Sequence, residues 1–248
     1  MARTAVVAGV GPGLGSSIVR KFAAEGCDVA MLARTESFLR DLADDLADAP
    51  GDVRAVPADL ASVDEVDAAF ATVRAELGPV DALVNHASAS RWTGLLDTTP
   101  DDLDRTLAVG VRGALRCSQH AVADMLDRSG PAGVAPASAA TGEGGAVVFT
   151  GATSAVRGRE GALGFSAAKF AARGMAQSMA RELGPEGIRV AHVVLDGGIM
   201  PPEGAPDPEA YLDPEELAAT YWDLVEDPRV DTMPFEVHLT NGGGIEFL

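Results

Sequence analysis

Short apolar runs alternate with longer amphipathic stretches along most of the chain. The apolar runs, which predict strands, cover residues 4–9, 28–34, 53–60, 80–87, 145–151, 188–195 and 234–240. The stretches with a helical period cover residues 13–26, 37–48, 62–78, 99–128, 161–184 and 213–227. Local sequence signals agree with several of these boundaries. Gly26 closes one helix, Pro50 follows another, Ser62 and Glu65 have the spacing of a capping box, and Thr99 is a candidate N-cap.

Strands that alternate with helices of this length form right-handed βαβ units around a parallel sheet. Because helices cover both faces of such a sheet, its strands read as continuous apolar runs. We therefore predict a doubly wound α/β fold with about seven parallel strands. No second core is evident, so residues 1–248 are expected to form a single domain. Small residues dominate 129–145, which we expect to be a flexible loop.

The net charge of the chain restricts the classes of partner that it can bind. The formal net charge is −18, from 37 acidic and 19 basic residues, and Lys21 and Lys169 are the only lysines. Such an acidic protein is a poor partner for nucleic acid or for anionic membranes. Adaptation to a high-salt cytoplasm explains the negative net charge. The alternative explanation is a high-GC genome, which accounts for the scarcity of lysine relative to arginine but not for the net charge.

Several further features indicate a cytoplasmic protein. No apolar run approaches the roughly 20 residues of a membrane span. The N-terminal segment enters a strand directly, without the apolar core and cleavage site of a signal peptide. Two cysteines make no disulfide framework, so Cys27 and Cys117 are expected to be buried free thiols. The sequence assigns no metal site.

A glycine-rich turn follows the first predicted strand and opens the first predicted helix. Its sequence is AGVGPGLGS, with Gly9, Gly13 and Gly15 as the spaced glycines. Such a turn lets backbone N–H groups approach a pyrophosphate at the helix N-terminus. A glycine-rich run alone also fits an ordinary tight turn. Its place on the first strand of a βαβ array favours a dinucleotide site.

The glycine spacing resembles the Thr-Gly-x-x-x-Gly-x-Gly turn of the short-chain dehydrogenase/reductase family, with Ala8 in place of the threonine. The likeness continues in order along the chain, through ADL at 58–60, VNHAS at 84–88, FSAAK at 165–169, LDGGIMP at 195–201 and TNGG at 240–243. The resemblance implies a Rossmann fold and a nicotinamide dinucleotide cofactor. It places cofactor-binding positions at Gly9, Gly13, Leu14, Gly15, Asp59, Leu60, Asn85, Ala87, Lys169, Gly197 and Ile199.

The end of the second predicted strand distinguishes the two nicotinamide cofactors. An NAD site places a carboxylate there for the ribose 2′-OH, whereas an NADP site uses an arginine for the 2′-phosphate. The sequence reads MLARTES, with no acid at the strand end and with Arg34 directly after it. A planar guanidinium suits a phosphate. We therefore expect NADP(H) in preference to NAD(H), although Arg34 also fits a solvated surface arginine.

The catalytic residues that the family resemblance implies are mostly replaced. Lys169 keeps the position of the lysine that binds the nicotinamide ribose. Phe165, Ala152 and Gly110 stand where the family has its tyrosine acid, its serine and its asparagine. Asp196, Pro201, His86 and Ser88 are further departures within the matching segments. The cofactor-binding half of the machinery is thus kept, and the proton-transfer half is not.

Other groups near this site are candidates for the missing acid. Thr153 and Ser154 follow Ala152, and His86 ends a strand beside the cofactor cleft. Tyr211 belongs to a predicted substrate lid over 201–227, and Ser166 points to another side of its helix. Each also fits a purely structural role. Thr153 and Ser154 could form hydrogen bonds within a loop, His86 could be hydrogen-bonded at its strand end, and Tyr211 could pack within the lid. Arg91 and Trp92 fit either a substrate wall or a solvated loop.

Three functions remain open from the sequence. The first is an oxidoreductase with a non-standard proton donor, acting on a small carbonyl or related activated substrate. The second is a catalytically inactive NADP(H)-binding sensor or partner protein on the same fold. The third is a lyase or isomerase. Family members assemble through the long helices after the fourth and fifth strands, so the resemblance implies a homodimer or homotetramer.

Overall fold

The computed structural model describes residues 3–89, 91–128, 144–226 and 234–241. Its main sheet contains β1 (Thr4–Ala8), β2 (Asp28–Ala33), β3 (Val53–Pro57), β4 (Ala82–Asn85), β5 (Ala146–Thr150), β6 (Arg189–Asp196) and β9 (Glu236–Thr240). The longer helices are α1 (Leu14–Ala24), α2 (Glu36–Asp45), α3 (Val63–Glu76), α4 (Pro100–Leu107), α5 (Ala114–Arg128), α7 (Leu163–Leu183) and α8 (Pro214–Glu226). Shorter elements are η1 (Ala108–Gly113), η2 (Thr153–Ala155), η3 (Gly184–Glu186), η4 (Pro208–Ala210), β7 (Gly198–Ile199) and β8 (Tyr211–Leu212).

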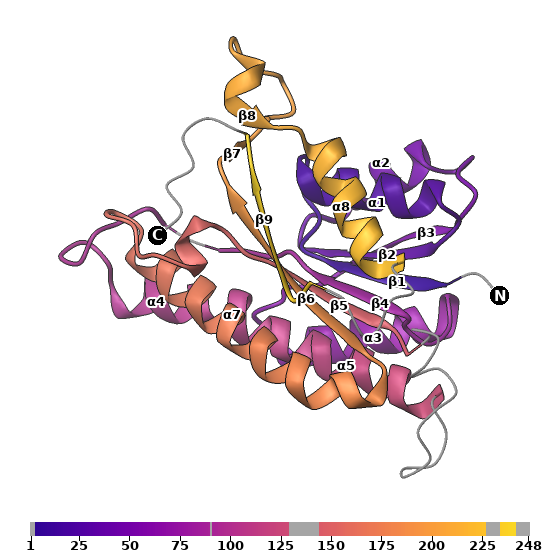
Figure 1. Cartoon of the computed structure of the whole chain (residues 1–248). Coiled ribbons are helices and arrows are strands. Elements are labelled where there is room, and N and C mark those ends of the chain that lie inside the picture. Colours follow the sequence, from indigo (N-terminus) through magenta and orange to yellow (C-terminus); the bar gives the residue numbers. More distant parts are fainter. Residues whose placement is uncertain (1–2, 90, 129–143, 227–233, 242–248) are drawn as a thin grey trace.

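The seven strands pair in the order β3-β2-β1-β4-β5-β6-β9, and every neighbouring pair is parallel. Helices α1, α2 and α8 cover one face of this sheet, and α3, α5 and α7 cover the other (Figure 1). The doubly wound α/β fold expected from the sequence is therefore confirmed. The strand order reverses between β1 and β4, which is where open sheets of this kind have a crevice at their carboxyl edge.

The alternation of side chains along each strand divides the core into two layers. In β1, Ala5 and Val7 pack against the α1 face, while Val6 and Ala8 pack against the opposite face. This period of two is why a strand covered on both faces must be apolar at every position. Cys27 and Cys117 are buried free thiols, as expected. Burial raises the pKa of Cys27 to about 11 and that of Cys117 to about 12, so both are neutral thiols at pH 7.

The predicted helix at 99–128 contains a π-helical turn, η1, between α4 and α5. The N-cap at Thr99 is confirmed, and it forms a full capping box with Asp102. The capping box expected at Ser62 is only half present. Ser62 Oγ accepts from the Glu65 N–H at 3.3 Å, but the Glu65 carboxylate accepts from the Asp59 N–H at 2.8 Å instead.

The segment expected to be a substrate lid is divided in two by the structure. Helix α8 packs against α1, with Tyr221 and Leu217 in the core, while residues 201–213 project beyond the body of the fold (Figure 1). Two-residue strands β7 and β8 pair at the base of this projection. A covering role remains a prediction for 201–213. Residues 129–143 of the expected flexible loop, and the glycines at 242 and 243, lie outside the described residues.

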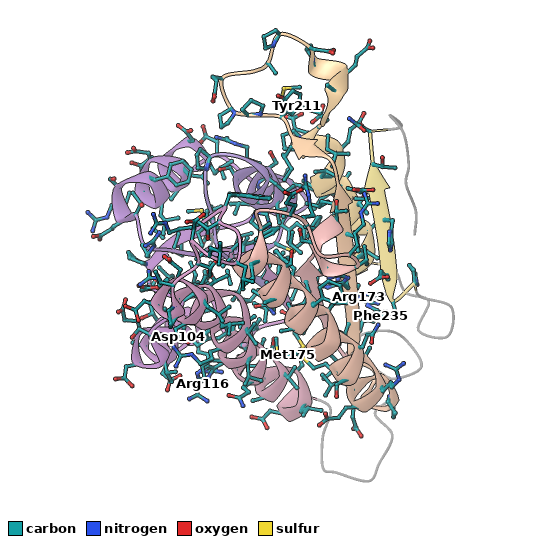
Figure 2. The ribbon with its side chains drawn as sticks, turned by 90° about the vertical axis from the view of Figure 1, so that its left-hand side faces the viewer. Asp104, Arg116, Arg173, Met175, Tyr211 and Phe235 are labelled. Atoms are coloured by element: carbon teal, nitrogen blue, oxygen red, sulfur yellow. The ribbon has the colours of Figure 1, made fainter. Side chains whose placement is uncertain are left out.

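A carboxylate at the edge strand joins β9 to α7 and β6. Arg173 donates to both Glu236 oxygens, at 2.6 and 2.9 Å, and His192 Nδ1 and His238 Nε2 lie 2.9 and 3.1 Å from them. Burial raises the pKa of Glu236, but hydrogen bonds from Arg173, His238 and His192 outweigh this effect and lower it to about 2. Arg173 and Phe235 are labelled beside this edge in Figure 2.

Replacing Glu236 by glutamine is expected to reduce the free energy of unfolding at pH 7 by about 2 kcal/mol, because Arg173 loses a charged partner. The folded-state pKa lies below the unfolded value of about 4.3, so the carboxylate stabilises the fold above about pH 5. This contribution disappears as the pH falls toward 2. Urea unfolding of both proteins at pH 7, 5, 4 and 3 should therefore give a difference in the free energy of unfolding that becomes smaller as the pH falls. A constant difference would contradict the assignment.

Within the described part of the chain, no helix combines the length and hydrophobicity that crossing a bilayer requires.

Candidate functional site

A cleft of about 1180 Å³ opens at the carboxyl ends of the parallel strands. The glycine turn and residues 195–202 line part of it, and the segment from β5 into α7 lines the rest. Of the positions singled out in the sequence, the cleft brings together Gly9, Gly13, Leu14, Gly15, His86, Ala152, Thr153, Phe165, Lys169, Asp196, Gly197 and Ile199. These residues come from distant parts of the chain. Their convergence makes this cleft the candidate active site.

The glycine turn places backbone N–H groups at one end of the cleft. Gly9 has φ +107°, and a Cβ there would lie 2.4 Å from the Ala87 backbone, so only glycine fits. Gly13 is the N-cap of α1 and provides no capping side chain, and the first turn carries no acidic residue. The Ser16 N–H donates to the Gly11 carbonyl at 3.1 Å, but the Leu14 and Gly15 N–H groups have no backbone acceptor among the described residues. These two N–H groups are available to an anion, as a dinucleotide phosphate requires.

A second hollow of about 220 Å³ adjoins the glycine turn at the ends of β2 and β3. Arg34, Asp59, Leu60 and Ala87 line it, four residues for which the sequence predicts cofactor binding. The Arg34 side chain is exposed and makes no hydrogen bond or ion pair with any described residue. Arg105, which the sequence analysis missed, reaches in from α4 and pairs with Asp59 Oδ2 at 3.0 Å. Only the tertiary contact between α4 and the segment that follows β3 reveals that residue.

Lys169 lies inside the cleft wall on α7, with 8% of its surface exposed. Its Nζ donates to the Thr150 carbonyl at 2.7 Å and lies 5.5 Å from the centre of the Phe165 ring. Burial lowers the pKa of Lys169 to about 8, because a buried ammonium loses hydration. An amine with that pKa is mostly protonated at pH 7 and still gives up its proton readily.

Phe165 belongs to a row of four side chains that we call the aromatic row: Arg159, Trp92, Phe165 and Lys169. The rings of Trp92 and Phe165 lie 5.4 Å apart, and the Arg159 guanidinium lies 5.6 Å from the centre of the Trp92 ring. All four members line the cleft. Trp92 was a predicted candidate for a substrate wall, whereas no sequence signal marks Arg159, because its place depends on how two loops meet.

Gly110 lies on η1, beside a small cavity of about 20 Å³. A Cβ at this position would meet only Ala168 Cβ, at 3.5 Å, so a methyl group would be accommodated. Asn85 lines the same cavity and not the cleft; its amide donates to Ser118 Oγ at 3.0 Å, and its Oδ1 is buried without a partner among the described residues. The cavity has room for a single ordered water.

The hydroxyl groups considered as alternative acids occupy unequal positions. Thr153 lines the cleft, but its hydroxyl donates to Asp196 Oδ1. Ser154 is buried below the cleft wall, and Ser166 Oγ accepts from the Arg159 N–H at 3.3 Å. Tyr211 is exposed on the projecting segment, where its ring packs over Gly198 (Figure 2). None of these four hydroxyls combines access to the cleft with a free proton.

His86 begins a chain of hydrogen bonds that leads away from the cleft. Its Nδ1 lies 3.0 Å from Thr150 Oγ1, which lies 2.8 Å from the buried hydroxyl of Tyr221. Burial, and to a lesser extent the charge of Lys169, lowers the pKa of His86 to about 4. The imidazole is therefore neutral at pH 7. Burial likewise raises the pKa of Tyr221 far above its ordinary value, so Tyr221 stays protonated.

Comparison with known proteins finds relatives that match most of the chain. The family model described as short chain dehydrogenase matches residues 3–200. A short chain dehydrogenase of Pseudocercospora fijiensis is 31% identical over 209 residues, which cover 83% of this chain and 62% of that protein. The L-xylulose reductase of Bos taurus is 30% identical over 217 residues, covering 88% of this chain and 79% of the relative.

A solved structure gives the same picture of the fold. The short-chain dehydrogenase of Rhodopseudomonas palustris superimposes with a TM-score of 0.80 at 28% identity, covering 96% of this chain and 98% of that one. The chain therefore spans less than two thirds of the fungal relative but nearly the whole of this bacterial one.

Proposed function

The chain belongs to the short-chain dehydrogenase family, and on that premise we propose that it is an NADP(H)-dependent oxidoreductase in which Lys169, not a tyrosine, handles the proton. The carrying observation is that Lys169 is the one protonated, titratable donor that the described structure places inside the cleft beside the Phe165 ring. The substrate is a small carbonyl compound or the corresponding alcohol.

The described residues fit a dinucleotide cofactor. Gly9 and Gly13 leave the approach to α1 open for the pyrophosphate, and Arg34 suits the 2′-phosphate of NADP(H). Gly197 and Ile199 suit the nicotinamide amide, by the family resemblance, and Lys169 suits the adjoining ribose. Bound in this orientation, the nicotinamide supplies or accepts a hydride. The chain itself must then hold the substrate oxygen and move one proton.

Lys169 is suited to that proton transfer. During reduction, Nζ gives a proton to the carbonyl oxygen, and the neutral amine regains one from solvent in the cleft. The other titratable candidate in the cleft, His86, is neutral at pH 7 because its pKa is about 4. Phe165 and Ala152 bring no hydroxyl of their own, so the degenerate tetrad expected from the resemblance is part of this proposal.

A catalytically inactive NADP(H) sensor is the second candidate. It is favoured by the lack of a polar side chain at 110, 152 and 165 together. The two functions share the nucleotide site and differ in turnover. NADPH oxidation against a panel of ketones, quinones and enones, in dilute buffer and in molar KCl, separates them. Tight nucleotide binding without turnover on any compound would favour the sensor.

Assembly and location extend the same proposal. A homodimer or homotetramer is supported by half-exposed apolar residues on the outer surfaces of two long helices, Leu115 on α5 and Phe170 on α7. A cytoplasmic location and adaptation to salt remain predictions from the sequence, and the net charge of −18 supports the second. Light scattering in high salt tests the assembly, and a monomer would contradict it.

Replacing Arg34 by leucine is expected to weaken NADPH binding by about 10- to 100-fold, because a guanidinium–phosphate contact is lost. The Kd for NADH should change by less than about 2-fold, since NADH lacks the 2′-phosphate. Calorimetric titration in 0.1 M KCl measures both constants.

Arg40→Leu is the matched control, because Arg40 is an exposed arginine of α2 whose partner is Glu36. Equal weakening in both variants would indicate a general charge effect. A selective loss of NADH affinity in Arg34→Leu would overturn the assignment of NADP(H).

A further inference from the structure

The substrate end of the cleft is positively charged in a strongly acidic protein. The chain has 37 acidic and 19 basic residues. Among the residues that line the cleft, however, Arg157, Arg159 and Lys169 are basic and Asp196 alone is acidic. Asp196 already accepts a hydrogen bond from Thr153. A local excess of positive charge against this background favours an anionic ligand.

Arg159 is held at the mouth of the cleft by an aromatic contact. Its guanidinium lies 5.6 Å from the centre of the Trp92 ring, and it forms no ion pair with any described residue. Stacking over a ring leaves the N–H edge of a guanidinium free, so that it can bind a carboxylate with two parallel hydrogen bonds.

Trp92 is a large hydrophobic side chain, yet it is 60% exposed. Its ring has two neighbours, Phe165 at 5.4 Å in a tilted contact and the Arg159 guanidinium at 5.6 Å, and it still lines the cleft. Such exposure of a large ring is unfavourable in water, and a flat ligand that covers it gains both burial and ring stacking. The aromatic row thus offers an apolar wall with a cation at each end.

The two cations of the row lie in different environments. Lys169 is buried at the inner end, beside Phe165, where the proposed proton transfer takes place. Arg159 is exposed at the outer end. The phosphate groups of the cofactor have their own positions, at the glycine turn and at Arg34. Arg159 is therefore available to bind an anionic group of the substrate.

We propose, resting on the proposed function above, that the substrate class is a planar aromatic or conjugated carbonyl compound with an anionic group. Its ring lies along Trp92 and Phe165, its carboxylate binds Arg159, and its carbonyl reaches Lys169. The anion fixes the orientation of the substrate, and the rings supply most of the buried area.

Binding of matched probes to the chain saturated with NADP⁺ tests this inference without turnover. The probes are 4-acetylbenzoate, its neutral methyl ester and 4-oxocyclohexanecarboxylate, which keeps the charge and lacks the aromatic ring. Quenching of tryptophan fluorescence in 0.1 M KCl reports binding at Trp92. The other tryptophan, Trp222, packs on Phe22 between α8 and α1. The Trp92→Phe variant keeps only Trp222, so any quenching that remains in it does not come from Trp92.

We expect 4-acetylbenzoate to bind about 10-fold more tightly than either other probe. Arg159→Gln should remove the preference over the ester and leave affinity for the ester unchanged. Arg181→Gln, the same change at an exposed position near the far end of α7, should preserve the preference. Equal affinity for all three probes, or no binding by any, would overturn the substrate class and leave the NADP(H) proposal intact. Failure of NADP⁺ itself to bind would overturn both.

Discussion

Lys169→Met is expected to lower kcat at pH 7 by about 10²- to 10⁴-fold for any carbonyl compound that the unmodified chain reduces. This is the range that a positioned acid contributes. Methionine is unbranched and only one heavy atom shorter than lysine, but it has no proton to give. Because the ammonium loses hydration in the cleft wall, its removal should not destabilise the fold. Steady-state NADPH oxidation and thermal unfolding measure the two effects.

The pH dependence separates an acid from a ribose anchor. If Lys169 donates the proton, reduction requires its protonated form, and kcat of the unmodified chain should fall as the pH rises through about 8. In Lys169→Arg the cation and its donors remain, but arginine does not release a proton in this range. That variant should therefore bind NADPH normally, lose the fall near pH 8 and stay slow. Restored kcat in Lys169→Arg would show that the lysine only anchors the cofactor.

The charges around Lys169 support this reading of the pH profile. His86 and His192 lie close enough for the lysine charge to act on both. Burial lowers the pKa of both histidines, so they are neutral at pH 8. Asp196 is the acidic residue among those that line the cleft. A kinetic transition near pH 8 is thus assigned to Lys169.

The order of the main elements was predictable because each obeys local physics. A strand covered on both faces must be apolar throughout, and the seven runs identified in the sequence became the seven strands. Thr99 and Asp102 meet within one helical turn, so their capping box needs no tertiary information. Gly9 has a local reason in its φ of +107°, and its close approach to the Ala87 backbone, far along the chain, adds a tertiary one.

The π-helical turn at 108–113 was not predictable, because one extra residue per turn barely changes a helical period. A tertiary contact lies at the end of this turn. A Cβ at Gly113 would lie 2.4 Å from the Leu60 carbonyl oxygen, so the helix passes directly against the segment that follows β3. The Glu65 carboxylate likewise accepts from the Asp59 N–H and not from the Ser62 N–H that a capping box requires.

The site was predictable where it follows the glycine turn and the βα order, and not where loops meet. Lys169, Phe165 and Ala152 were located by motif spacing, and the structure brings them to one cleft. Arg159 joins the aromatic row, and Arg105 joins Asp59, through contacts between segments far apart in sequence. Asn85 illustrates the converse. Motif spacing identified this strand end, but Asn85 lines the small cavity and not the cleft, and its amide donates to Ser118 Oγ.

The double substitution Ala152→Ser with Phe165→Tyr is expected to raise kcat/KM for a simple aromatic ketone by about 10²-fold or more. Phe165 faces the cleft one helical turn from Lys169, whose Nζ lies 5.5 Å from the ring centre. A phenol at this position gains an adjacent cation that favours its ionised form, and a serine at 152 adds a donor for the carbonyl oxygen. NADPH oxidation with acetophenone, compared with the unmodified chain, gives the readout.

Phe170→Tyr is the matched control, because Phe170 lies on α7 with its side chain half-exposed and does not line the cleft. It adds the same hydroxyl to the same helix, and it should leave the rate unchanged. Combining Lys169→Met with the double substitution should abolish most of the gain, since the phenol loses its neighbouring cation. A correctly folded double variant that binds NADPH but reduces no ketone would mean that the cleft does not align a carbonyl with the cofactor. That outcome would favour the nucleotide sensor over the oxidoreductase.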